Sequence, residues 1–176
     1  MLFVKTKLEG AFVVDLDMRE DARGFFARAF CRAEFERHGL NGTVAQCNIS
    51  FSERRGTLRG LHYQLTPHAE CKFVRCIRGS IFDVIVDLRP LSSTWLKWMG
   101  VNLSADNRRA IFVPEGFAHG FQTLEDGSEV LYQVSQFYSS EYERGLRWND
   151  RAVAIEWPIA PSVISERDQS HPDFTS

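Results

Sequence analysis

The feature that most constrains the fold of this chain is a close succession of short apolar segments with a two-residue period. In residues 81–88, every second side chain from Phe82 onward is apolar, whereas Asp83 and Asp87 occupy alternate positions. This period is that of a β-strand whose two faces meet different surroundings. Many such segments at short spacing predict a β-sandwich or barrel.

Strand and helix patterns together predict eleven elements along the chain. We expect strands at Phe12–Leu16, Gly24–Ala27, Val44–Phe51, Leu58–Gln64, Lys72–Arg78, Ile81–Leu88, Trp98–Leu103, Ala110–Pro114, Phe117–Leu124 and Val130–Tyr138, and one helix at Cys31–His38. Gly39 closes the helix, because glycine accepts the left-handed conformation common after a helix. Gly79-Ser80 and Asp126-Gly127 are predicted to be hairpin turns. The chain after Trp157-Pro158 is expected to be a loop, apart from a helical turn at Ser165–Asp168.

Composition restricts the protein to a globular class. Hydrophobic residues make up 44% and charged residues 25% of 176 residues, and neither repeats nor linkers interrupt them. We therefore expect one domain over residues 1–176. The net charge of −2 gives no reason to expect nucleic-acid binding. No apolar run is long enough to span a membrane.

The four cysteines include no C-x-x-C pair, which argues against a zinc knuckle or a redox-active dithiol. Residues 1–7 already include two charged side chains, Lys5 and Lys7, and lack the apolar stretch of a signal peptide. Free thiols in a reducing cytoplasm are therefore expected.

Three clusters contain the residues best suited to chemistry. The first is the segment 59–64 with Lys72 one strand later, and the second is the segment 114–121, which includes His119. The third is Tyr132 with Tyr138, predicted to share one face of a strand. Each residue also has a structural interpretation: His62 as a hydrogen-bonded core histidine, Lys72 as a charged strand edge, Tyr132 as packing, and His119 as a brace of the barrel.

The pattern P-x-G-x-x-H at residues 114–119 is similar to the second motif of cupins, which are small double-sheet β-barrels. Metal-binding cupins have H-x-H followed by Glu in their first motif. Here that motif is His62-Tyr63-Gln64 with Glu70 beyond it, so an amide replaces one imidazole and Lys72 adds a positive charge. Amides are weak ligands for most transition metals. We expect no metal, although a set of His62, Gln64, Glu70 and His119 is not impossible.

Over nearly its whole length the chain resembles the dTDP-4-dehydrorhamnose 3,5-epimerase family of cupins. The matching stretches are Asp21–Phe26, Gln46–Asn48, Arg59–Gln64, Lys72–Arg75, Gly79–Pro90, Val113–Phe121, Leu131-Tyr132, Tyr138, Glu143–Asp150, Trp157-Pro158 and Ser165–Asp168. The resemblance implies a mainly β, cupin-type double-sheet antiparallel barrel (jelly roll) with few short helices. It also implies no cofactor, a nucleotide-diphosphate 4-keto-6-deoxyhexose as substrate, and a homodimer whose N-terminal part reaches into the neighbouring site.

The resemblance also implies catalytic roles. His62 is the base, Asp168 pairs with its imidazole, Lys72 stabilises the enolate oxygen, and Tyr132 returns a proton from the opposite face. Arg23 and Arg59 bind the diphosphate, and Phe26 and Tyr138 stack on the base of the nucleotide. The remaining substrate contacts implied are Gln46, Asn48, His119, Glu143 and Arg167.

At four positions the chain departs from the usual family residues. Arg28 replaces the common Glu, Cys47 the common Asp, Glu70 the usual Gln, and Arg167 the usual Lys. Arg28 and Cys47 belong to the region implied to bind the nucleotide. We hypothesise that Arg28 favours a base such as cytosine or guanine, the alternative being that it faces solvent or a phosphate.

The preferred function is 3,5-epimerisation in the formation of dTDP-L-rhamnose. An epimerase that inverts only C3 or only C5 of a dTDP-, CDP- or GDP-linked 4-keto sugar is the alternative. A metal-dependent cupin dioxygenase or isomerase and a non-catalytic sugar-binding cupin are the other possibilities.

Overall fold

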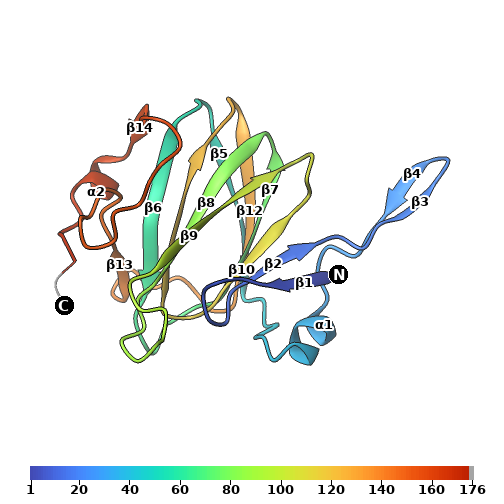
Figure 1. The fold of residues 1–176 in the computed structure, drawn as a ribbon, viewed down its shortest axis with the longest axis horizontal. Coiled ribbons are helices and arrows are strands. Elements are labelled where there is room, and N and C mark those ends of the chain that lie inside the picture. Colours follow the sequence, from blue (N-terminus) through green and yellow to red (C-terminus); the bar gives the residue numbers. More distant parts are fainter. Residues whose placement is uncertain (175–176) are drawn as a thin grey trace.

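Two facing β-sheets form the body of the protein in the computed structural model, which describes residues 1–174 (Figure 1). The first sheet has the order β1-β2-β10-β7-β12-β5. Its strands are β1 (Leu2–Lys5), β2 (Phe12–Asp15), β5 (Gln46–Ser52), β7 (Lys72–Arg78), β10 (Ala110–Val113) and β12 (Ser128–Val134). The second has the order β13-β6-β11-β8-β9, with β14 beside β6. Its strands are β6 (Thr57–Gln64), β8 (Ser80–Asp87), β9 (Trp98–Ser104), β11 (Phe117–Thr123), β13 (Glu143–Gly145) and β14 (Val163–Ile164).

Four further elements lie outside the two sheets. Strands β3 (Arg19–Asp21) and β4 (Gly24–Phe26) form an antiparallel hairpin that projects away from the body (Figure 1). Helix α1 (Arg32–Arg37) follows this hairpin, and α2 (Glu166–Gln169) lies next to β6 near the C-terminus. No helix among residues 1–174 is long and apolar enough to cross a bilayer.

The mainly β, double-sheet cupin fold is confirmed, and so are the ten predicted strands and the helix, with ends shifted by a few residues. Four short strands (β1, β3, β13 and β14) were not predicted. The pairing is antiparallel throughout except between β14 and β6, which run parallel. The last two residues of the predicted domain 1–176 lie outside the described residues.

Both predicted turns form, but the prediction that they make hairpins is wrong. Gly79 has φ +72° and Gly127 φ +65°, so the turns themselves form. However, each joins strands of different sheets: Gly79 links β7 to β8, and the turn before Ser128 links β11 to β12. Turn chemistry fixes the local bend but not the strand's partner, which burial between the sheets decides.

The core lies between the two sheets, and both sheets also bury part of their outer faces. Val74 and Ile111 of the first sheet pack with Ile81 and Ile85 of the second in the central cluster. Outside the first sheet, α1 inserts Phe35 against Phe73 and Phe112. Outside the second, the chain after β13 covers Val84 and Val86. Strand β8 is therefore buried on both faces, which explains why its two aspartates need partners.

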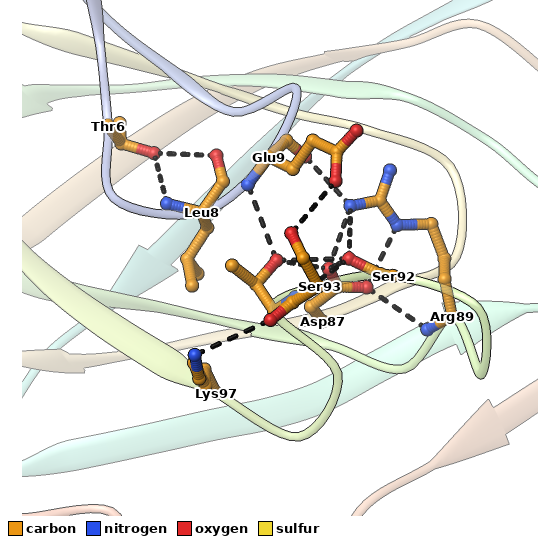
Figure 2. A network of polar contacts seen from close by, with 9 residues as sticks. Thr6, Leu8, Glu9, Asp87, Arg89, Ser92, Ser93 and Lys97 are labelled. Carbon is orange, nitrogen blue, oxygen red and sulfur yellow. Dashed lines mark hydrogen bonds and ion pairs between the residues drawn. The ribbon is translucent and has the colours of Figure 1, made fainter.

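A polar network ties the two sheets together at one end (Figure 2). Asp87, at the end of β8, is fully buried and accepts hydrogen bonds from Arg89 (2.7 and 2.8 Å), Ser92 (2.5 Å) and Thr94 (2.6 Å). Arg89 also donates to the backbone oxygen of Glu9, in the β1–β2 loop of the first sheet, at 2.8 Å. These bonds outweigh the effect of burial, which acts to raise the pKa, and lower the pKa of Asp87 to about 2.

Candidate active site

A cavity of about 450 Å³ opens between the two sheets. Strand β6 contributes Arg59 and His62, β7 begins at Lys72, and β12 contributes Tyr132. The other predicted site residues that line it are His119, Arg167 and Asp168. Because side chains alternate along each strand, those facing the space between the sheets converge here.

Two ionisable side chains that line the cavity, His62 and Asp168, are in direct contact. His62 Nε2 lies 2.7 Å from Asp168 Oδ1, and Asp168 Oδ2 accepts the backbone N–H of Gly60 at 3.1 Å. Ser165 caps α2 by accepting the backbone N–H of Asp168 at 3.1 Å, which holds the carboxylate in place. Burial acts to raise the pKa of Asp168, but the bonds to His62 and to Gly60 outweigh it and lower the pKa.

An ionised Asp168 fixes the tautomer of His62. A carboxylate only accepts hydrogen bonds, so the proton of a neutral imidazole lies on Nε2. The lone pair is then on Nδ1. The pair can therefore act as an oriented general base.

Lys72 and Tyr132 supply the complementary groups. The Lys72 ammonium donates to Glu70, and both side chains are almost fully buried. Burial raises the pKa of the Tyr132 phenol, with Arg59 opposing the shift and Glu70 adding to it. Tyr132 is therefore a neutral proton donor at physiological pH.

A second cavity of about 380 Å³ shares His62, Lys72 and Tyr132 with the first. Its other predicted residues are Gln46 and Asn48 on β5, Tyr138, and Glu143 on β13. The Tyr138 hydroxyl donates to Glu143 at 2.6 Å, and the Arg167 guanidinium also pairs with Glu143. Burial acts to raise the pKa of Glu143, but these two bonds lower it, so a carboxylate links the two side chains.

The predicted strand shared by Tyr132 and Tyr138 is wrong. Strand β12 ends at Val134, and Tyr138 lies in the following segment, where its backbone N–H donates to the Gln46 side chain at 2.8 Å. This hydrogen bond and the one to Glu143 hold Tyr138 at the cavity by loop contacts instead of strand periodicity.

Four predicted substrate contacts lie outside both cavities of their own chain. Arg23 precedes β4 and Phe26 ends it on the projecting hairpin; the Arg23 side chain is 89% exposed and the Phe26 residue 72% exposed. Arg28 follows this hairpin and lies 3.9 Å from Glu34. Cys47 lies between Gln46 and Asn48 on β5, so strand alternation turns its side chain away from the cavity that they line.

The residues at the cupin metal-ligand positions are all engaged elsewhere. Gln64 bonds to the backbone of His68 (2.9 Å) and of Ser139 (2.6 Å), and Glu70 pairs with Lys72. His119 Nε2 lies 2.8 Å from Asp83 Oδ2. These pairings do not fit a metal at that position.

Sequence reasoning missed two residues next to the site. Asp83, the partner of His119, is fully buried, and burial raises its pKa although His119 opposes the shift. The diagonal position of Asp83 and His119 across β8 and β11 follows from strand pairing, which the sequence did not predict. His171 lies against the His62–Asp168 pair, and its i+3 spacing from Asp168 was the available indication.

Comparisons with known proteins identify the family to which this fold belongs. The family model described as dTDP-4-dehydrorhamnose 3,5-epimerase matches residues 5–176. The dTDP-4-dehydrorhamnose 3,5-epimerase of Shigella flexneri is 45% identical over 96% of this chain and 93% of its own.

Two solved structures add to this comparison. The crystal structure of the Elizabethkingia anophelis dTDP-4-dehydrorhamnose 3,5-epimerase superposes with a TM-score of 0.95 at 42% identity, covering 99% of this chain and 96% of that one. A 3′-monoepimerase from Streptomyces bikiniensis, solved with dTDP-quinovose, gives 0.87 at 32% identity, covering 96% and 85%. The family match over almost the entire sequence, together with a histidine–aspartate pair in a cavity between two cupin-type sheets, shows that this chain belongs to the dTDP-4-dehydrorhamnose 3,5-epimerase family.

Proposed function

We propose that this protein inverts C3 and C5 of dTDP-4-dehydro-6-deoxyglucose by removing and returning protons through an enolate. The observation that carries the proposal is the 2.7 Å contact between His62 and Asp168 on a cavity that Lys72 and Tyr132 also line. The ketone at C4 acidifies the hydrogens at C3 and C5, because the resulting carbanion is an enolate. A base, an acid and a positive charge at the enolate oxygen are then the groups required.

The proposed base and the proposed acid come from different sheets. His62 comes from β6 of the second sheet, whereas Tyr132 comes from β12 of the first. A base and an acid on opposite sides of a sugar ring invert a centre, whereas one group alone returns the proton to its own side. Lys72 stabilises the negative charge on the C4 oxygen, and losing such a donor typically costs about a hundredfold in rate.

The second cavity is proposed to hold the nucleotide. Arg59 is proposed to bind the diphosphate, because a guanidinium offers paired donors to phosphate oxygens. Tyr138 stacks on the base, and Gln46 and Asn48 supply polar contacts from β5. Glu143 and Arg167 orient the Tyr138 hydroxyl.

We also propose that the active form is a homodimer. Arg23 and Phe26 are exposed on a hairpin that projects from the body, where they contribute nothing to their own cavities (Figure 1). A second copy of the chain gives them a function, if each hairpin enters the other protomer's site. In that arrangement Arg23 contacts the diphosphate and Phe26 covers the base opposite Tyr138. A cytoplasmic location stays a prediction of the sequence, which fractionation of cells that express the protein tests.

Incubation with dTDP-4-dehydro-6-deoxyglucose in heavy water tests the catalytic proposal. The wild-type protein is expected to place deuterium at C3 and C5 with inversion, as followed by NMR. Tyr132→Phe is expected to retain exchange but to lose inversion, because the base is intact and the opposite acid is absent. His62→Ala is expected to abolish exchange, and persistent exchange in that variant would contradict the assignment of the base.

The same assay separates the alternative functions. Deuterium at one carbon only identifies a monoepimerase, which the 32% identity to the 3′-monoepimerase keeps as the second candidate. Faster turnover of a CDP- or GDP-linked sugar supports a role for Arg28 in base choice, and a strong dTDP preference excludes it. Loss of activity in a chelator identifies a metal-dependent cupin, and the absence of any exchange identifies a non-catalytic binding protein.

A further inference from the structure

A third side chain lies beside the proposed catalytic pair, and the proposed epimerase mechanism does not use it. His171 Nε2 is 3.8 Å from Asp168 Oδ1, and the imidazole rings of His171 and His62 lie 5.9 Å apart, edge to face. The His171 side chain is only 13% exposed. Its Nε2 atom is buried and has no hydrogen-bond partner among residues 1–174, which is costly for a polar atom.

His62, Asp168 and His171 have the composition of a metal site. One ligand atom from each lies within 4.8 Å of the others, and no second such group occurs among residues 1–174. Two imidazoles and a carboxylate are typical ligands of Zn²⁺, which binds them at about 2.0–2.2 Å. Ligand atoms around a tetrahedral ion then lie about 3.4 Å apart, so small side-chain movements are enough to close this site.

The chain holds His171 in this position. The C-terminal segment is tied down by a 2.5 Å hydrogen bond from the Phe174 backbone N–H to Asp150 and by the pairing of Asp173 with Arg147. The His171 ring lies directly over Gly145 of β13. A Cβ added at Gly145 would stand 2.0 Å from His171 Nε2, so only glycine leaves space for the imidazole.

The charges around Asp168 leave its carboxylate available to a cation. Three cationic side chains line the same cavity, but Lys72 is paired with Glu70 and Arg167 with Glu143, and Arg59 donates to Ser52 and to the backbone oxygen of Phe51. Among residues 1–174, the ion pairs of Asp168 are with histidines and not with a lysine or arginine. Its partners are the imidazoles that would become its fellow ligands.

We propose that His62, Asp168 and His171 bind a divalent ion of the Zn²⁺ class, and that the bound ion inhibits the epimerase. The inhibitory part rests on the proposed role of His62 as the base. A neutral imidazole has one lone pair, so when an ion takes one ring nitrogen the other carries the proton. His62 then has no lone pair left to accept a proton from C3 or C5.

Binding of Zn²⁺ to the metal-stripped protein, measured by competition with a chromophoric chelator, tests the site. The wild-type chain is expected to bind one ion, and His171→Gln to bind at least tenfold more weakly after losing one of three ligands. Gly145→Ala is expected to weaken binding as well, because it displaces the imidazole without removing it. His68→Gln is the matched control, since His68 lies outside the cluster, and it is expected to bind like the wild type.

Inhibition is tested separately in the heavy-water assay with added Zn²⁺. Exchange by the wild type and by His68→Gln is expected to stop and to return when a chelator is added. His171→Gln is expected to exchange at the basal rate and to resist the same Zn²⁺ concentration. Absence of exchange in metal-free wild type contradicts the proposed function, whereas the chelator competition still decides the ion site.

Two results overturn the site itself: no ion bound by the wild type, or equal affinity in His171→Gln and wild type. If His171→Gln fails to fold, the spectrum of Co²⁺ bound to the wild type replaces it. An intense visible band of a tetrahedral nitrogen–oxygen site supports the proposal, and the pale spectrum of hydrated Co²⁺ contradicts it.

Discussion

At the scale of single residues, the proposed site depends on which nitrogen of one imidazole carries a proton. Asp168 is ionised, and it holds that proton on Nε2 of His62 through a 2.7 Å contact. The sequence predicted this pair only through the family resemblance, because 106 residues separate the two positions. His171 shows the limit of that approach, since a residue outside a family's motifs has no role to carry over.

Asp168→Asn tests the tautomer directly. The amide can donate to Nε2, which moves the imidazole proton to Nδ1 and removes the base. We expect the rate of deuterium exchange to fall by about 10³–10⁴-fold, with a small change in substrate affinity. Glu166→Gln, on the exposed face of the same helix, is the control and should keep the wild-type rate. An Asp168→Asn variant within tenfold of wild type would rule out the tautomer argument.

Glu70→Gln tests the electrostatics of Lys72. The Glu70 carboxylate partly cancels the ammonium charge at the proposed position of the enolate oxygen, and both side chains are nearly buried. The amide keeps the shape and the acceptor but removes the negative charge, so we expect turnover to rise by about two- to tenfold. Steady-state kinetics measures the turnover of Glu70→Gln against that of the exposed control Glu141→Gln. A slower Glu70→Gln enzyme would show that Glu70 mainly positions Lys72.

At the scale of elements, the β3–β4 hairpin carries two proposed substrate contacts, yet it lines neither of the two cavities of its own chain. Its antiparallel pairing spans only residues 19–26, and the Arg23 guanidinium forms a 2.6 Å ion pair with Asp21 of the same hairpin. A hairpin this short and exposed is marginal alone. Docking onto a second chain would supply the missing burial.

Mixed dimers provide the corresponding test. Arg23→Ala and His62→Ala chains are each expected to be nearly inactive. Once mixed and allowed to exchange subunits, half of the dimers contain one of each chain, and one of their two sites has both wild-type residues. We therefore expect activity to recover to about one quarter of the wild-type value per chain. A mixture that stays inactive, although native mass spectrometry shows heterodimers, would place Arg23 in the site of its own chain.

Element positions were predictable where periodicity or a glycine specified them, as in β7 and α1. Strand partners were not, because Gly79 and the turn before Ser128 bend the chain in the same way whether the next strand joins the same sheet or the opposite one. Tyr138 was misplaced for a related reason. The aromatic pair Phe137-Tyr138 suits a strand that continues past Val134, but the hydrogen bonds that Tyr138 donates to Gln46 and Glu143 decided its conformation.

At the scale of the whole molecule, Asp87 joins the two sheets electrostatically (Figure 2). Burial opposes ionisation of Asp87, yet its hydrogen bonds lower the pKa from 3.8 to about 2. Because folding lowers this pKa, the ionised carboxylate stabilises the fold at any pH above the ordinary pKa of an aspartate. That contribution, about 2 kcal/mol, is lost as the pH falls from about 4 toward 2.

Asp87→Asn is therefore expected to lower the free energy of unfolding at pH 7 by at least about 2 kcal/mol, since Arg89 is left without its carboxylate. The difference from wild type should shrink on acidification through that pH range, as measured by urea unfolding. Asp15→Asn, which breaks the more exposed pair with Arg109, is expected to change stability by under about 1 kcal/mol. A pH-independent difference for Asp87→Asn would contradict the electrostatic explanation.

In the proposed dimer, the projecting hairpin also makes catalytic activity depend on the concentration of the protein. If every working site draws Arg23 and Phe26 from another copy, a lone protomer is folded but incomplete. Dilution should then abolish activity while each protomer is still folded. Turnover per chain should rise with total protein concentration until dimerisation is complete. In a cell, synthesis of more protein would raise flux more than proportionally at low expression, which makes the assembly equilibrium itself a control on the reaction.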